Sequence, residues 1–194
     1  MTSGIIWRHI ATFALPSALG LLFQQLYNTS DSVVVGRFVG KQALAAVGGT
    51  TAIVSAMVCL CVGLSLGSTI TISQAYGARD YHRLQDSVHT AVALTVLLAV
   101  FATALGLVLV VPLLNLMDIP PDVFDDACLY LRIYFCGLLG LFLYNICSSI
   151  LRAVGNSRQP LYFLMFSAIL NIALDLVFVV AFRLGVAGVA YATV

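Results

Sequence analysis

Residues 87–116 read SVHTAVALTVLLAVFATALGLVLVVPLLNL and contain no Asp, Glu, Lys or Arg. About 20 consecutive apolar residues are enough for a helix to cross the hydrocarbon core of a bilayer, so this stretch predicts a membrane-spanning helix. The rest of the chain has a similar composition, with 61% hydrophobic and 9% charged residues. Soluble domains have about 45–50% and about 25%. The sequence therefore predicts an all-α integral membrane protein whose partner is the lipid bilayer.

Turn-forming and polar residues divide the chain into six predicted helices. They cover approximately residues 10–35, 47–76, 87–116, 127–151, 161–182 and 186–194. The last of these is much shorter than the roughly 20 residues that a spanning helix needs. We therefore expect a six-helix transmembrane bundle with a truncated sixth helix, and a chain that is part of a longer protein.

The distribution of basic residues favours a cytoplasmic N-terminus, because Lys and Arg are enriched in cytoplasmic loops. With that orientation, the cytoplasmic side carries Arg8, Arg79, Arg83, Arg152 and Arg158, and the other side carries Arg37, Lys41, Arg132 and Arg183. The net charge is only +1 and no basic stripe is present. Nucleic acid is therefore not an expected partner.

Two aspartates, Asp31 and Asp175, lie alone among apolar residues, whereas the other acidic residues lie near predicted loops. A carboxylate in the middle of a bilayer costs roughly 2.5–3.5 kcal/mol on insertion scales. Intramembrane acids of this kind commonly bind a proton, a cation or a charged ligand. We expect the same of Asp31 and Asp175, although hydrogen bonding to neighbouring hydroxyls and amides is the structural alternative.

Each aspartate belongs to a polar stripe on its own helix. Gln24, Asn28 and Asp31 follow an i, i+4, i+7 spacing, and Asn171 and Asp175 are four residues apart. In a membrane such stripes must face protein or water. If the two carboxyl groups meet in the bundle, they repel each other and titrate as one coupled pair. For Gln24 and Asn28, helix–helix contact and ligand contact are both compatible with the sequence.

Pro16 lies about four turns before Asp31 on the first predicted helix. Proline removes a backbone hydrogen bond and bends or softens a helix, so Pro16 is a predicted hinge. The five cysteines lie mostly in apolar segments and lack the spacing of a zinc site. No metal site is therefore predicted, except that Asp31 and Asp175 could hold sodium.

Four sequence segments resemble multidrug and toxic-compound extrusion (MATE) transporters, in the same order along the chain. They are Pro16-x14-Asp31-x4-Gly36-x3-Gly40-x3-Leu44-Ala-Ala-Val-Gly48, Gln74-Ala-Tyr-Gly77, Leu151-Arg-Ala-Val-Gly-Asn-Ser-Arg-Gln-Pro160, and Leu170-Asn-Ile-Ala-Leu-Asp175 followed by Gly185-Val-Ala-Gly-Val-Ala-Tyr-Ala-Thr193. Together they extend over essentially the whole chain.

The resemblance implies a twelve-helix protein made of two six-helix lobes around a central cavity, of which residues 1–194 match the N-terminal lobe. It also implies a cation-responsive cluster formed by Asp31, Asn171, Asp175, Tyr130 and Thr193, with Tyr134 as the alternative to Tyr130. Gln24 and Asn28 are the candidate substrate-cavity residues. The C-terminal lobe would be the missing partner.

The function implied is multidrug efflux by a secondary antiporter of the bacterial inner membrane. Such a transporter exports small organic, often cationic, compounds in exchange for protons or sodium, and it is neither an enzyme nor dependent on a cofactor. Two alternatives are a transport-incompetent half-lobe and a lipid flippase with a similar two-lobe plan. An intramembrane aspartyl protease is disfavoured because neither aspartate lies in a Tyr-Asp or Gly-x-Gly-Asp motif.

Overall fold

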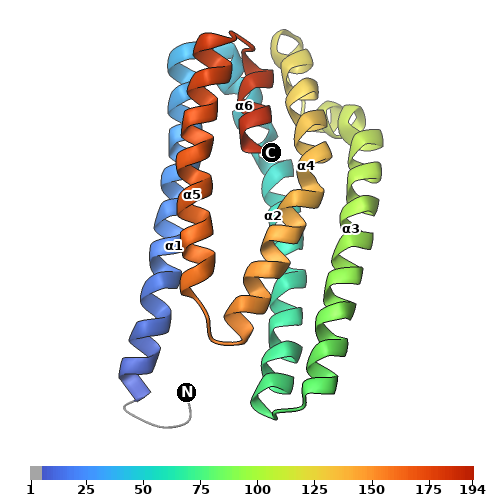
Figure 1. The fold of residues 1–194 in the computed structure, drawn as a ribbon. Coiled ribbons are helices and arrows are strands. Elements are labelled where there is room, and N and C mark those ends of the chain that lie inside the picture. Colours follow the sequence, from blue (N-terminus) through green and yellow to red (C-terminus); the bar gives the residue numbers. More distant parts are fainter. Residues whose placement is uncertain (1–5) are drawn as a thin grey trace.

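The computed structural model describes residues 6–194, and these form a bundle of helices without any strand (Figure 1). The elements are α1 (Ile6–Val34), η1 (Val35–Val39), α2 (Lys41–Gly77), α3 (Tyr81–Leu116), α4 (Pro121–Ala153), α5 (Arg158–Asp175), η2 (Leu176–Ala181) and α6 (Val186–Thr193). The elements η1 and η2 are short π-helical segments that continue α1 and α5. The prediction of an all-α six-helix membrane bundle is confirmed.

Within the described residues, four helices are long and apolar enough to cross a membrane: α2, α3, α4 and α5 together with η2. Many of their large apolar side chains point outward, including Leu97 on α3, which is 67% exposed. Contiguous apolar surface of this extent is unusual on soluble monomers. A bilayer is the environment that would cover it.

Three helices begin six residues earlier than the sequence indicated, at Lys41, Tyr81 and Pro121. The first six residues of these helices, KQALAA, YHRLQD and PDVFDD, mix polar and apolar side chains and therefore lie outside the long apolar stretches that the sequence shows. Local capping explains two of these starts. The Asp80 side chain accepts a hydrogen bond from the Arg83 backbone N–H at 3.0 Å, and Pro121 occupies the first turn of α4, where proline is favoured.

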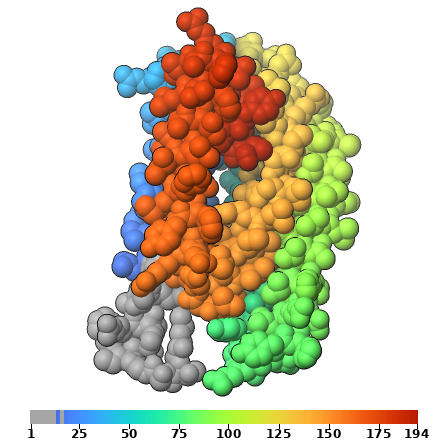
Figure 2. Space-filling model, in the orientation of Figure 1, coloured from blue at the N-terminus to red at the C-terminus, as the bar shows by residue number. Residues whose placement is uncertain are grey.

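The helices pack as two groups (Figure 1). Helices α2, α3 and α4 pack against one another, whereas α1 packs mainly against α5. The short helix α6 packs on α4 and α5, and it therefore connects the two groups. Figure 2 shows α5 and α6 side by side with α4 on one face of the molecule.

The core is centred on one face of α4. Its buried side chains recur at helical spacing, at Leu131, Phe135, Leu138 and Phe142. The Phe135 ring lies directly against Gly106 of α3, where an added Cβ would collide with it. A small residue at this position allows α3 and α4 to approach closely.

Candidate functional site

Helix α5 contributes two polar residues to the interior of the bundle. Asp175 is completely buried and Asn171, one turn earlier, is 3% exposed. They share one face because residues four apart are neighbours on a helix. Asp175 is also the last residue of α5, immediately before the π-helical segment η2, and π-helical turns are frequent at functional sites.

Helix α1 brings Asp31 beside Asp175 and Asn171. Asp31 is half-buried and lies four residues before the other π-helical segment, η1. The two carboxyl groups, which are 144 residues apart in the sequence (175 − 31), therefore meet in the folded protein. Only the Asp31 end of the polar stripe on α1 therefore meets the polar stripe on α5.

Thr193 of α6 contacts the same carboxyl group. Its Oγ1 lies 3.3 Å from Oδ2 of Asp31 and 2.9 Å from the carbonyl oxygen of Val189. A threonine hydroxyl has only one hydrogen to donate. Full use of both contacts therefore requires either a shared hydrogen or a proton on Asp31 that is donated to Thr193.

Tyr130 of α4 completes the group. It is buried and lies near both Asp31 and Asp175. Tyr134, one turn later, stacks on Tyr130 with ring centroids 6.3 Å apart and lies beside Cys61. Of the two tyrosines that the sequence offered, Tyr130 is the one close to both carboxyl groups.

Five polar atoms of this group are buried without a hydrogen-bond partner. They are Oδ1 of Asp31, both carboxyl oxygens of Asp175, and both the oxygen and the nitrogen of the Asn171 amide. A buried polar atom without a partner costs about 1–3 kcal/mol, and more when it is charged. Such an arrangement can take up a proton or a small cation, either of which would supply interactions that the side chains lack.

Tyr27 of α1 is a site residue that the sequence analysis missed. It lies one turn before Asp31, near both Asp31 and the Thr193 side chain. The i, i+4 spacing from Tyr27 to Asp31 was the available signal. Among the residues of this helix, amides and a carboxylate are conspicuous because they are costly in a membrane, whereas a tyrosine is not.

The predicted cavity residues lie outside this group. Gln24 and Asn28 are both exposed, one turn apart on the same face of α1. Pro16 falls within the span of α1, but its side chain lies outside the described residues. The substrate and hinge roles of these residues therefore stay predictions.

The described residues contain no group of three or more His, Cys, Asp or Glu that could hold a metal ion. The oxygens of Asp31, Asp175, Asn171 and Thr193 are nevertheless the carboxylate, amide and hydroxyl type that hard cations prefer. Their chemistry fits sodium better than a transition metal.

Comparison with known proteins gives matches to a single protein family along nearly the whole chain. The MatE family model matches residues 16–177. The probable multidrug resistance proteins YoeA and YpnP of Bacillus subtilis (strain 168) are each 34% identical over 193 residues, which cover 97% and 100% of this chain. A crystal structure of MATE in the bent conformation superimposes with a TM-score of 0.91 at 28% identity, over 98% of this chain.

The chain spans only about two-fifths of the length of these relatives, namely 42% of YoeA, 43% of YpnP and 42% of the solved MATE chain. The matches nevertheless extend over nearly all of this chain, and the family model alone covers most of it. The chain therefore belongs to the MatE family of MATE transporters.

Proposed function

We propose that this chain provides the cation-coupling part of a multidrug efflux transporter. The transporter would export organic, often cationic, compounds in exchange for protons or sodium. It would act in a bacterial inner membrane with a cytoplasmic N-terminus, and a second lobe would complete the substrate cavity. The multidrug resistance names of YoeA and YpnP support efflux as the activity.

The observation that carries the proposal is the pair of neighbouring carboxyl groups, Asp31 and Asp175, with three unpartnered buried oxygens. Burying one charge costs several kcal/mol even after relaxation of the protein. Two like charges side by side are more unfavourable still. The pair is therefore expected to carry a proton or to hold a cation whenever no cationic substrate lies beside it.

Exchange follows from this charge balance. A cationic substrate in the adjoining cavity would favour the state in which the aspartates are ionised, and a proton or sodium ion would favour the state in which their charge is neutralised. Each ligand then weakens the binding of the other by the same factor. Competition of this kind is the thermodynamic basis of antiport.

Thr193 suggests how binding of the ion is passed to the helices. With Asp31 ionised, the Thr193 hydrogen is drawn toward the carboxylate; with Asp31 protonated, it is free to remain on the Val189 carbonyl. The contact between α1 and α6 thus differs between the two states. Bending of α1 at Pro16 would then change the space beside Gln24 and Asn28.

Replacement of Asp31 by Asn in the complete transporter tests the proposal. The side chain keeps its shape but loses its ionisable group, so drug efflux driven by an imposed cation gradient should fall to the level of protein-free vesicles. Drug binding in detergent should persist, which separates lost coupling from misfolding. Undiminished gradient-driven efflux by the Asn variant would refute the role assigned to Asp31.

The coupling ion requires a second measurement on the same vesicles. Removing sodium at fixed pH should leave efflux intact if protons are the coupling ion, whereas collapsing the pH gradient at fixed sodium should stop it. The opposite pattern would identify sodium.

A further inference from the structure

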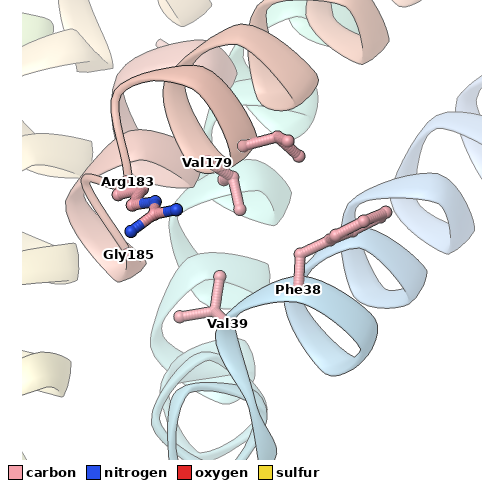
Figure 3. Close-up of a pocket in the computed structure, with 6 residues that line it drawn as sticks. Phe38, Val39, Val179, Arg183 and Gly185 are labelled. Atoms are coloured by element: carbon pink, nitrogen blue, oxygen red, sulfur yellow. The ribbon is translucent and has the colours of Figure 1, made fainter.

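A hollow of about 420 Å³ lies between the two π-helical segments, and neither Asp31 nor Asp175 lines it. It is lined by Phe38 and Val39 of η1, Val179 and Val180 of η2, and Arg183 and Gly185 of the following turn (Figure 3). Four of these six residues are large and apolar. Arg183 is the single charged residue of the lining, and no acidic residue contributes to it.

The turn after η2 holds Arg183 beside this hollow. The backbone N–H groups of Phe182 and Leu184 donate to the carbonyl oxygens of Val177 and Phe178, both at 3.0 Å. Arg183 itself has a φ of +53°, a left-handed conformation that few residues other than glycine adopt. Figure 3 shows its side chain across the hollow from the ring of Phe38.

Charge is segregated at this end of the molecule. Arg37 and Lys41, both exposed, lie at the neighbouring junction of η1 and α2 and add positive charge to that of Arg183. The acidic residues of this end belong to the turn before α4 and to the start of α4: Asp118, Asp122, Asp125 and Asp126. The hollow therefore lies at the basic side of this surface.

The hollow lies at one end of a candidate membrane span. Val179 and Val180 belong to the last turn of the span Arg158–Ala181, and Arg183 follows two residues after its end. Phe38 is 52% exposed and Val180 is 48% exposed, so the apolar walls open outward. A ligand here would meet apolar side chains on the membrane side and a guanidinium at the surface.

We propose that this hollow binds one anionic phospholipid, with its phosphate on Arg183 and the start of an acyl chain between Phe38 and Val180. Guanidinium groups bind phosphate through paired, charge-assisted hydrogen bonds. The basic neighbours Arg37 and Lys41 favour a lipid with net negative charge over a zwitterionic one. This inference depends on the membrane location of the chain and is independent of the coupling role proposed for Asp31.

Binding is measured on the complete protein in detergent, by native mass spectrometry and by the rise in melting temperature on adding phosphatidylglycerol. Arg183→Gln should weaken phosphatidylglycerol binding by about tenfold or more, because it removes the paired, charge-assisted hydrogen bonds to the phosphate. Arg158→Gln is the matched control, since Arg158 is an exposed arginine at the opposite end of the same span. That control should bind the lipid as the unmodified protein does.

Further arms test the two halves of the ligand. Phosphatidylcholine and inorganic phosphate should each stabilise the protein much less than phosphatidylglycerol does. Phe38→Ala should weaken lipid binding although Arg183 is unchanged. This variant keeps the proposal testable if Arg183→Gln does not fold. Equal binding by Arg183→Gln, an equal loss in Arg158→Gln, or equal stabilisation by phosphatidylcholine or by phosphate alone would overturn the proposal.

Discussion

Asn171 is the residue at which the requirements of stability and of the candidate site conflict most directly. Both polar atoms of its amide are buried without a hydrogen-bond partner, so the residue weakens the fold unless something binds to it. Asn171→Leu has similar size and removes the unpartnered group. We expect the free energy of unfolding of the variant to be unchanged or to rise by up to about 1–3 kcal/mol, and its melting temperature to rise accordingly. Gradient-driven efflux should be lost.

Asn145→Leu is the matched control for this prediction. Asn145, on α4, donates a hydrogen bond to the Leu141 carbonyl at 2.9 Å, so its removal should lower stability by about 0.5–1.5 kcal/mol. Thermal unfolding in detergent measures both variants. Strong destabilisation by Asn171→Leu would indicate that the amide has a structural partner in the folded protein.

For individual residues, physical chemistry explains which members of the site the sequence could reveal. Asp31 and Asp175 were evident because a charge among apolar residues is costly and rare. Tyr27 gave no comparable signal, because a tyrosine can enter a membrane helix without the cost of a buried charge. Tyr130 and Tyr134 could not be distinguished by spacing alone, since only the packing of α4 decides which ring lies near the carboxyl groups.

The elements divide into the pair α1–α5 and the trio α2–α3–α4, and the candidate site lies where they meet. Asp31 and Asp175 belong to the pair, Tyr130 to the trio, and Thr193 to the connecting helix α6. A change of charge at this position acts on contacts between the groups, while the packing inside each group can stay the same. Such bistable interfaces are the usual way in which a small local change becomes a helix movement.

The close approach of α3 and α4 can be tested at Gly106. An added methyl group would collide with the buried ring of Phe135, so Gly106→Ala should lower the free energy of unfolding by about 1–3 kcal/mol, as overpacking usually does. Gly140→Ala on α4 is the control, because no atom lies within 4 Å of its added Cβ. Thermal unfolding compares the two.

Combining Gly106→Ala with Phe135→Leu should recover part of the lost stability, since the smaller side chain leaves room for the methyl group. An equal melting temperature for Gly106→Ala and Gly140→Ala would contradict the close packing of α3 against α4 in the structure.

Hydropathy predicted the apolar middle of each helix accurately and the helix ends less accurately. The long apolar stretches of α2, α3 and α4 were recognisable, but the first six residues of each helix mix polar and apolar side chains and gave no such signal. The π-helical segments η1 and η2 were not anticipated at all. The sequences of these segments, VGRFV and LVFVVA, are equally compatible with an α-helix, because the wider turn leaves no clear pattern in composition.

For the whole molecule, the prediction that Gln24 and Asn28 line a cavity implies that the exposed polar face of α1 meets water and the exposed apolar face of α3 meets lipid. Asn28 and Leu97 are both exposed, yet only Asn28 belongs to a polar stripe. With the five native cysteines replaced, Asn28→Cys should react rapidly with a membrane-impermeant thiol reagent, because a substrate cavity is filled with water. A transported drug should slow that reaction.

Leu97→Cys is the control for a surface covered by lipid, and it should react slowly whether or not drug is present. Equal reactivity at the two positions would contradict the assignment of Gln24 and Asn28 to a cavity.

The contact between Asp31 and Thr193 joins residues 162 positions apart, which has a consequence for biosynthesis. At about 5–20 residues per second of translation, roughly 10–30 s pass between the synthesis of the two residues. During that time α1 must remain in the bilayer while its polar stripe waits for α5 and α6. An insertion chaperone or transient partner that shields α1 during this interval would raise the yield of folded protein, and slow translation after α1 would expose the nascent chain to quality-control proteases.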